Sequence, residues 1–282
     1  MKDRWEIVDT VQINKINWFP GHMKKATDEI KKKLSIIDLI IEVVDARCIN
    51  SSSNFDLTNL IENKPIIRIA LKSDLSLISE QYTNELIVTN TKNKNNRKKI
   101  IDVFYSIFES KINKYKSKGL VNPRFSIMII GLPNVGKSSL INFLKSKNNL
   151  IVRNQPGVTK NQRLVSINEN FDLIDTPGIL LKNIDNYEIA YKLSLINTIK
   201  KEVLPLDKVV KFGFDYLNSH FYQELKNFYK IDDFSNFENF QILVAKRLNY
   251  ITKNEEIDLK RLEDKLFNDF LECKISKVNY DF

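Results

Sequence analysis

The residues best suited to chemistry lie in one short glycine-containing stretch, GLPNVGKSS, at Gly131–Ser139. It fits the pattern GxxxxGK[ST] and lies between a strand-like apolar run and a helix-like amphipathic run, the context in which this pattern binds phosphate. Its two glycines let the backbone bend so that successive N–H groups and the helix N-terminus face an anion. Lys137 is expected to pair with the β- and γ-phosphates, and Ser138 to offer its hydroxyl to Mg²⁺. The predicted nucleotide contacts here are Asn134, Val135, Gly136, Lys137, Ser138 and Ser139.

A second motif, DTPG at Asp175–Gly178, closes another apolar run about forty residues later. Beside a phosphate loop, the acid of such a motif holds Mg²⁺ through a water molecule and its glycine N–H contacts the γ-phosphate. We expect these roles for Asp175 and Gly178. Between the two motifs, PGVTK contains Thr159, a candidate switch threonine that ligates Mg²⁺ only when the γ-phosphate is present. Taken alone, Thr159 is a turn residue, so its assignment depends on its neighbours.

Base recognition is predicted for the segment ALKSDL, which resembles the guanine motif [N]KxD. Asp74 would accept hydrogen bonds from the ring N1–H and the 2-amino group, a donor pattern that adenine lacks, and the stem of Lys72 would stack over the base. The usual asparagine is replaced by Leu71. The replacement removes a side chain that commonly braces the base site against the phosphate loop, and it bears on GTP affinity more than on guanine selectivity. Backbone contacts to the base are expected about fifteen residues later, from Thr89 and Asn90.

The order of these motifs is unusual. The guanine motif ordinarily follows DTPG, but here it precedes the phosphate loop by about sixty residues. Each motif occurs once, so a second nucleotide-binding domain is not required. A circularly permuted sheet brings the same strand ends together, and we predict that arrangement.

Six short apolar, β-branched runs are the candidate strands, and they end before residue 180. They occupy residues 36–45, 65–71, 85–90, 125–131, 163–168 and 171–176. Runs that are apolar almost throughout suit strands covered on both faces, and the amphipathic stretches between them suit crossover helices. Those stretches lie around residues 24–35, 97–116 and 137–146. We predict an α/β fold with a mostly parallel six-stranded sheet.

The pattern changes to helical spacing near residue 185. We therefore predict two domains, a circularly permuted P-loop domain at 1–184 and an all-helical C-terminal domain at 185–282. The polar stretch TNTKNKNNRKK at 89–99 is the candidate for an exposed basic loop.

Composition narrows the class of protein. The chain has 282 residues, 43% of them hydrophobic, and no apolar run approaches the roughly 20 residues needed to cross a bilayer, so we expect no membrane insertion. The first 20 residues lack the features of a secretory signal or a transit peptide. Cys48 and Cys273 lie far apart without a CxxC pair, which argues against zinc or a disulfide framework. Residues 1–184 carry 29 Lys and Arg against 18 Asp and Glu. This surplus suits a polyanionic partner, although solvated lysines explain it equally well.

At this point the chain resembles a known family, the circularly permuted GTPases of ribosome assembly that include ribosome biogenesis GTPase A and its mitochondrial counterparts. The resemblance covers nearly the whole chain. It rests on WFPGHMKKA, VVDAR, ALKSDL, GLPNVGKSS, PGVTK and DTPGIL in that order, and more faintly on DLKRLEDKLFNDFLECK. The departures are Leu71, the stretch CINSSSN where the family usually shows a proline, and Cys273 where it usually has glycine.

The resemblance implies GTP hydrolysis with Mg²⁺ and K⁺. Signalling GTPases place a water-orienting glutamine after DxxG, but this chain has Ile179. In the family that work is assigned to the histidine of WFPGHM, here His22, which can orient or deprotonate a water. The alternative is a structural turn in which His22 is merely hydrogen-bonded. The resemblance also gives Asn134 a potassium ion that neutralises transition-state charge, with loop bracing as the alternative.

The partner implied is the precursor of the large ribosomal subunit, through its rRNA and proteins, bound in the GTP state and released after hydrolysis. A monomer in the bacterial cytoplasm is expected, with a mitochondrial or plastid form as the alternative. A second class of function, a nucleotide-gated RNA-binding adaptor with negligible catalysis, is suggested by Leu71 and Ile179. Arg47 has two open roles, RNA contact or capping of a strand, and His220 is expected to be an ordinary core or surface histidine.

Overall fold

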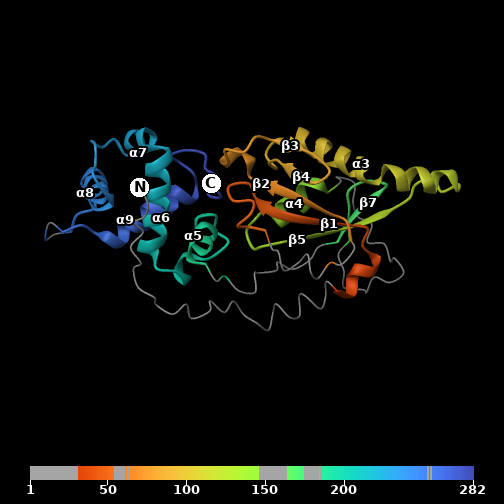
Figure 1. Ribbon diagram of the computed structural model, residues 1–282, viewed down its shortest axis with the longest axis horizontal. Coiled ribbons are helices and arrows are strands. Elements are labelled where there is room, and N and C mark those ends of the chain that lie inside the picture. The colour runs from red at the N-terminus through yellow and green to blue at the C-terminus, as the bar shows by residue number, and fades with distance from the viewer. Residues whose placement is uncertain are drawn as a thin grey trace, which may run out of the picture.

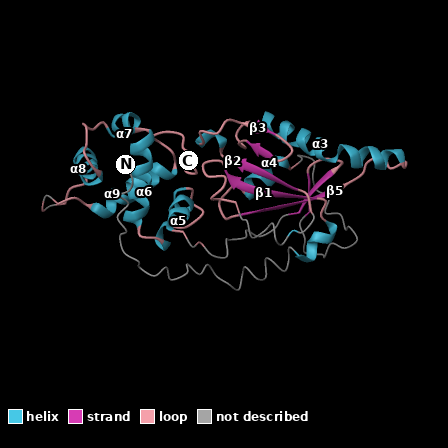
Figure 2. Cartoon of the chain, in the orientation of Figure 1, coloured by secondary structure: helices cyan, strands magenta, loops and turns pink. Residues whose placement is uncertain are grey.

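The structure, a computed structural model, describes residues 31–53, 61, 64–145, 164–174, 184, 186–252, 254 and 256–282. Its described part has a β-sheet with flanking helices at one end and a group of helices at the other (Figure 1). The arrowheads of β1 and β2 point toward the helical group (Figure 2). The carboxyl ends of these strands therefore face the helices.

One sheet contains every described strand. The strands are β1 (Leu39–Asp45), β2 (Ile66–Leu71), β3 (Gln81–Tyr82), β4 (Leu86–Val88), β5 (Phe125–Gly131), β6 (Leu164–Ser166) and β7 (Phe171–Ile174). Their order is β3-β4-β2-β1-β5-β7-β6. The pairs β4·β2, β2·β1, β1·β5 and β5·β7 are parallel, and the two outer pairs are antiparallel. All six predicted strands are present.

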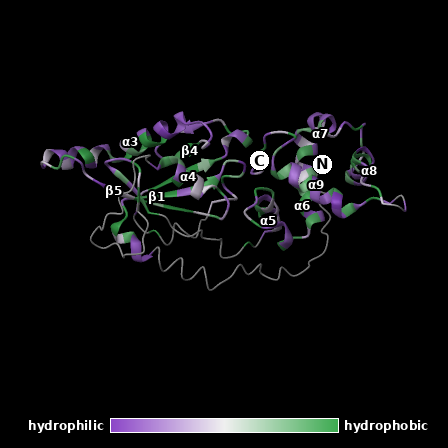
Figure 3. Ribbon diagram, turned by 180° about the vertical axis from the view of Figure 1, so that it is seen from behind, coloured by the Kyte–Doolittle hydropathy of each residue, from purple (hydrophilic) through white to green (hydrophobic). Residues whose placement is uncertain are grey.

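The predicted strand number was low by one, because the described part of the chain contributes seven strands to the sheet. The missed strand, β3, has two residues and pairs antiparallel with β4. A strand this short shows no periodicity from which it could be predicted. The two central strands behave as expected, since every residue of β1 and of β5 is buried. Their hydrophobic colouring is visible in Figure 3, and burial on both faces explains why these runs are apolar without alternation.

The long helix α3 (Asn95–Ser117) covers one side of the sheet. Its buried residues Ile100, Phe104, Phe108 and Ile112 recur every four positions, which places them on one stripe. The ring of Phe108 stacks on Phe125 of β5 with centroids 4.3 Å apart. The second helix of this region, α4 (Lys137–Leu144), follows β5 directly. Two of the three predicted crossover helices, at 97–116 and 137–146, are thus present. Of the predicted stretch at 24–35 the structure describes residues 31–35, which are helical.

The stretch 89–99 is not simply an exposed basic loop. Helix α3 begins at Asn95, and both Thr89 and Asn96 are fully buried. The Asn96 amide donates to Glu80 Oε1 at 3.1 Å and to the Asn90 carbonyl at 3.2 Å. Buried polar groups of this kind need partners, and those partners hold the start of the helix against the strand ends.

The described residues after 186 form helices joined by short turns. They are α5 (Tyr187–Leu195), the 3₁₀ helix η3 (Lys201–Val203), α6 (Leu206–His220), α7 (Tyr222–Tyr229), α8 (Phe237–Leu248) and α9 (Leu259–Leu271). Helices α6 and α9 approach closely at Gly213, where a Cβ would lie 2.7 Å from Phe270 Cδ2. Inside the group, the buried carboxylate of Asp269 accepts from Tyr229 Oη at 3.0 Å and pairs with Lys265 and Lys274.

The last residues of the chain return to the sheet end. The Val278 N–H donates to the Leu75 carbonyl at 3.1 Å, and the Tyr280 N–H donates to the Arg47 carbonyl at 2.7 Å. The Asp281 carboxylate accepts from the Ser51 hydroxyl at 2.5 Å. This C-terminal segment thus lies between the loops that follow β1 and β2 and the helical group, since the Asn279 N–H also donates to Tyr216 Oη of α6.

Candidate functional site

The phosphate-loop residues lie where β5 turns into α4, as the motif requires. Leu132 and Val135 are buried and anchor the loop, whereas Asn134, Ser138 and Ser139 are exposed. Gly136 has φ 108°, a left-handed conformation that favours glycine. The first helical residues, beginning with Lys137, present N–H groups that a helix cannot bond internally, and this end carries a partial positive charge. Such an arrangement suits an anion.

The segment with the guanine-motif pattern lies at the end of β2, two strands from the phosphate loop in the sheet. Lys72 has φ 64° and precedes the 3₁₀ helix η2 (Ser73–Leu75), which contains Asp74. The Asp74 carboxylate accepts from Lys92 Nζ at 2.6 Å, and the Lys92 side chain is 77% exposed. An ion pair so open to solvent is weak, so a ligand that offers two donors can displace it.

The end of β4 supports this segment. The Ser73 N–H donates to the Thr89 carbonyl at 3.1 Å, and the Asn90 amide donates to the Ser73 hydroxyl at 3.2 Å. Glu80 binds both of these side chains, because its Oε1 accepts hydrogen bonds from Asn90 Nδ2 at 2.7 Å and from Ser73 Oγ at 3.2 Å. The structure therefore brings Thr89 and Asn90 beside the Lys72–Asp74 segment.

The two segments meet at Lys72. Its Nζ donates to the Asn134 carbonyl of the phosphate loop at 3.0 Å and to Asp45 Oδ2 at 2.8 Å. Positions 62 residues apart in the chain thus share a hydrogen bond. The permuted order of motifs still produces one continuous site, formed at the carboxyl ends of parallel strands, where open α/β sheets bind ligands.

Leu71 occupies the position of the usual asparagine and contacts the phosphate loop through its apolar side chain. It is 2% exposed, and a Cβ placed on Gly136 would lie 2.8 Å from Leu71 Cδ1. Residues 71–74, which carry the guanine-motif pattern and are called the base segment below, are therefore packed against the phosphate loop by van der Waals contact at this point.

Asn134 links the phosphate loop to the helical group. Its backbone has φ 60°, and its amide Nδ2 donates to the Asn197 carbonyl at 2.7 Å. The neighbouring Thr198 hydroxyl donates to the Pro133 carbonyl at 3.2 Å. The turn after α5 thus braces the outer edge of the loop, which is the loop-bracing role for Asn134.

Comparison with known proteins identifies the family. The model of the family described as 50S ribosome-binding GTPase matches residues 126–245. The chain is 40% identical to probable ribosome biogenesis GTPase A of Mycoplasma genitalium over 97% of this chain and 99% of that protein. It is 35% identical to ribosome biogenesis GTPase A of Priestia megaterium over 77% of this chain and 79% of that protein. This chain belongs to the ribosome biogenesis GTPase A family.

The fold of this ribosome biogenesis GTPase A family member agrees with a solved structure. The crystal structure of GNP-bound YlqF from T. maritima superimposes with a TM-score of 0.64 at 23% identity, covering 91% of this chain and 97% of that one. The circularly permuted P-loop fold expected from the motif order is therefore confirmed, and the chain is a member of a GTPase family.

Four predicted site residues, His22, Thr159, Asp175 and Gly178, lie outside the described residues, as do the motifs that contain them. The other predicted nucleotide contacts are described. The structure groups them in two clusters joined by Lys72, with Lys72, Asp74, Thr89 and Asn90 in one and Asn134 to Ser139 in the other. Lys137 Nζ lies over its own loop and donates to the Leu132 carbonyl at 2.5 Å.

Two residues at the site were not predicted as part of it. Asp45 is fully buried and Arg47 is 2% exposed, so Arg47 is not available for RNA contact. The Asp45 carboxylate accepts hydrogen bonds from Arg47 Nε at 2.9 Å and from Lys72 Nζ at 2.8 Å. Burial opposes ionisation of Asp45, but the hydrogen bond and charge of Arg47, followed by those of Lys72, outweigh it and lower the pKa of this carboxyl. The sequence signal that could have identified this pair is VVDAR, in which an aspartate ends a central strand and an arginine lies two residues later.

The remaining sequence candidates have ordinary surroundings. His220 Nδ1 lies 2.9 Å from the Tyr216 carbonyl, and its ring stacks on Tyr216. Cys48 and Cys273 are free thiols, and burial raises the pKa of each. Among the described helices, none is both long and apolar enough to cross a membrane.

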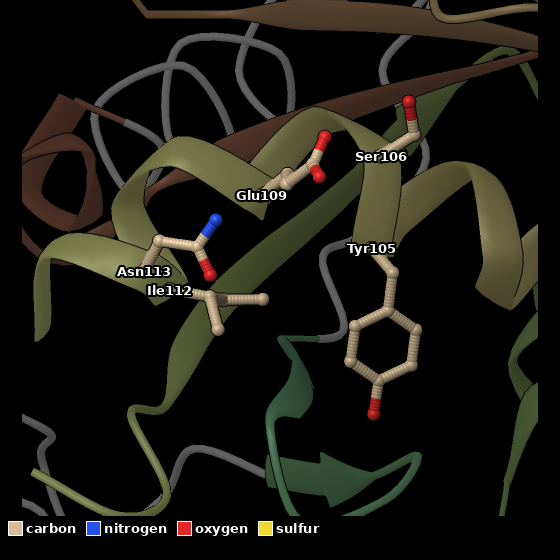
Figure 4. A pocket seen from close by; sticks show the side chains of 5 residues that line it. All are labelled: Tyr105, Ser106, Glu109, Ile112 and Asn113. Carbon is tan, nitrogen blue, oxygen red and sulfur yellow. The ribbon is translucent and has the colours of Figure 1, made fainter. Parts of the chain in front are cut away.

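A hollow of about 350 Å³ lies elsewhere, along α3. Figure 4 shows the side chains that line it, which are Tyr105, Ser106, Glu109, Ile112 and Asn113. All five come from one helix, and none belongs to the phosphate loop or the base segment. This hollow is therefore separate from the candidate nucleotide site.

Proposed function

We propose that this chain binds GTP with Mg²⁺, hydrolyses it, and uses the two nucleotide states to bind and leave the immature large ribosomal subunit. The observation that carries the proposal is the hydrogen bond between Lys72 Nζ and the Asn134 carbonyl. It joins a segment with the guanine-motif pattern to a phosphate loop in a chain whose family consists of GTPases. Relatives at 40% and 35% identity carry names of ribosome biogenesis GTPases, which supports the ribosomal partner.

The proposed nucleotide contacts keep the roles expected from the motifs. Asp74 accepts hydrogen bonds from the guanine base, and the side-chain stem of Lys72 stacks over that base. The backbone of Thr89 and Asn90 contacts the base as well. The phosphates are bound by residues Asn134, Val135, Gly136, Lys137, Ser138 and Ser139, with Thr159 and Gly178 at the γ-phosphate. Ser138 fits a magnesium ligand, because it is exposed in the first turn of α4 and offers a hydroxyl oxygen. Thr159 and, through water, Asp175 would complete the set.

For hydrolysis, we propose that His22 orients or deprotonates the attacking water, since Ile179 replaces the usual glutamine. A potassium ion at Asn134 would stabilise the charge that develops in the transition state. The contacts of Asn134 fit this role, because its amide nitrogen is held by the Asn197 carbonyl. The amide oxygen is then the end that offers a ligand, and carbonyl oxygens suit potassium.

We further propose that the chain divides into a nucleotide-binding domain at 1–184 and a helical domain at 185–282. The change from strands to helices among the described residues supports this division. The basic surplus of residues 1–184, 29 Lys and Arg against 18 Asp and Glu, supports contact with rRNA. We propose that the protein acts as a monomer in the bacterial cytoplasm, where the precursor particle is assembled.

The decisive experiment compares GTP and ATP turnover by the purified chain in potassium and in sodium, with and without large ribosomal subunits. We expect slow GTP turnover alone, faster turnover in potassium, and further stimulation by the particle. Co-sedimentation with large subunits should require a non-hydrolysable GTP analogue. Equal turnover of GTP and ATP, or no association with subunits at low salt, would contradict the proposal.

A matched pair of variants isolates base recognition. Asp74→Asn exchanges a charged acceptor for a neutral one, and hydrogen bonds to charged groups contribute about 1.5 to 3 kcal/mol. We therefore expect the preference for GTP over ATP to fall by roughly 10- to 100-fold. Asp172→Asn is the control, because Asp172 of β7 pairs with Arg124, the residue before β5, and not with the base segment. It should leave the preference unchanged, and an equal effect of both variants would exclude Asp74 as the base reader.

A further inference from the structure

A buried ion pair connects the nucleotide site with the helical group. Asp45 ends β1 and is fully buried, and Arg47, two residues later, is 2% exposed. The guanidinium binds both oxygens of the carboxylate through one edge, with Nε donating to Oδ1 at 2.9 Å and Nη2 to Oδ2 at 2.8 Å. This bidentate geometry fixes the orientation of both groups.

The other donors of Arg47 reach two helix ends. Nη1 donates to the carbonyl of Leu271, the last residue of α9, at 2.7 Å, and Nη2 lies 3.4 Å from the carbonyl of Ile196, which caps α5. Carbonyls at helix C-termini lack intrahelical partners and carry a partial negative charge. A buried cation satisfies both ends at once, so Arg47 holds α5 and α9 against the end of β1.

The same carboxylate also holds the nucleotide site. Asp45 Oδ2 accepts from Lys72 Nζ at 2.8 Å, and Lys72 Nζ in turn donates to the Asn134 carbonyl at 3.0 Å. Lys72 has φ 64°, an unfavourable conformation for a residue with a side chain, so its position needs such support. One carboxylate is therefore shared between a lysine of the base segment and an arginine that binds two helices.

A second path joins the same parts. The turn after α5 contacts Arg47 through Ile196, and the next two residues, Asn197 and Thr198, contact the phosphate loop at Asn134 and Pro133. A shift of this turn would move groups bonded to both the phosphate loop and Arg47. The loop and the two helix ends thus cannot move independently.

We propose that Asp45 is a positioning residue with two effects. It orients Lys72 for GTP and, through Arg47, it couples nucleotide binding to the packing of α5 and α9 against the end of β1. This inference rests on the proposed GTP-binding function. A purely structural ion pair would stabilise the fold without changing nucleotide affinity or its effect on the helices. Coupling predicts that both change together, because linked sites influence each other reciprocally.

The test uses the full chain with Asp45→Asn, which preserves shape and removes the charge shared by Arg47 and Lys72. GTP affinity is measured by isothermal titration, and amide hydrogen exchange of residues 193–199 and 268–274 is measured with and without GTP. In the wild type, GTP should slow exchange in both segments. In Asp45→Asn the dissociation constant for GTP should rise about tenfold, within the range typical of coupled sites, and the GTP-dependent protection should be lost.

Asp172→Asn is the matched control. It removes one partner of another Arg–Asp pair, 2.6 Å apart and 28% and 7% exposed, which involves neither Lys72 nor the helical group. It should retain both the affinity and the protection. If Asp45→Asn binds GTP within twofold of Asp172→Asn, or keeps the GTP-dependent protection, the inference is wrong.

Two further measurements separate the possible failures. If the wild type does not bind GTP, the proposed function fails rather than the coupling. If Asp45→Asn does not fold, Arg47→Lys replaces it, because lysine keeps the charge but lacks the planar fork that binds Asp45 and two carbonyls together. Arg47→Lys should then lose the GTP-dependent protection of residues 193–199 and 268–274, and unchanged protection would overturn the proposal.

Discussion

Truncation of Leu71 tests how the base segment supports the phosphate loop. Leu71 ends β2 and is 2% exposed. A Cβ on Gly136 would lie 2.8 Å from Leu71 Cδ1, so the leucine fills the space beside the glycine of the loop. Leu71→Ala removes that contact and leaves a cavity between the two segments.

Two magnitudes follow from this contact. Buried Leu→Ala changes cost about 2 to 5 kcal/mol of unfolding free energy, from lost transfer energy and the residual cavity. GTP binding should also weaken, since the loop must be ordered without its packing partner. A loss of about 0.5 to 1.4 kcal/mol corresponds to a 2- to 10-fold rise in the dissociation constant.

Ile69→Ala is the control for stability. Ile69 is fully buried in the same strand, two residues earlier and on the same face. Urea unfolding should show similar losses of stability for both variants, and titration with a fluorescent GTP analogue should show weaker binding for Leu71→Ala alone. Equal GTP affinity in the two variants would refute the view that Leu71 supports the phosphate loop.

Three other outcomes are expected. Gly136→Ala should weaken GTP binding at least tenfold in the same titration, because φ 108° and the Leu71 contact both oppose a side chain. Adding Leu71→Ala to Gly136→Ala should restore part of the lost affinity. A Gly136→Ala variant that binds GTP as tightly as the wild type would contradict this expectation. Asp269→Ala should lower the unfolding free energy in urea by about 1 to 3 kcal/mol, because Tyr229 Oη loses its buried acceptor, and no measurable loss would argue against it. The pKa of Asp45 is lowered in the folded state, so its ion-pair stabilisation should be complete above its ordinary value near 3.9 and decline as pH falls through the folded-state pKa. The difference in unfolding free energy between wild type and Asp45→Asn should therefore be constant above about pH 5 and shrink in acid, and a difference that grows in acid would reverse the sign.

Long apolar runs made the sheet predictable. Strands β1 and β5 are buried along their whole length, so their sequences carry a continuous signal, and all six predicted strands were correct. The two-residue strand β3 carries no such signal. The start of α3 was also hidden, because residues 94–99 are polar and lysine-rich, and only tertiary contacts reveal that Asn96 is buried.

The site could be predicted as far as its motifs extend. Spacing alone located the phosphate loop and the base segment, and the structure joins them through Lys72. The contact of Leu71 with Gly136 was not predictable. The motif shows that the usual asparagine is absent, but it does not indicate which atoms the replacing side chain contacts. Arg47 was likewise ambiguous, since a charged residue is buried only where several acceptors converge. Two of its acceptors, the carbonyls of Ile196 and Leu271, come from residues 149 and 224 positions away.

The strand order explains why the residues after β1 connect so many parts. In the sheet, β1 lies between β2, which carries the base segment, and β5, which carries the phosphate loop. Asp45 is paired with Leu71 on one side, and Val43 with Gly131 on the other. A side chain at the end of β1, such as that of Asp45, can therefore reach the candidate nucleotide site, although neither half of that site is its neighbour in sequence. An acid at this position can bind a lysine of the site, and an arginine two residues later can extend the contact to the helices. The permuted order thus keeps the two segments of the candidate nucleotide site together and places the end of β1 in contact with the helical group.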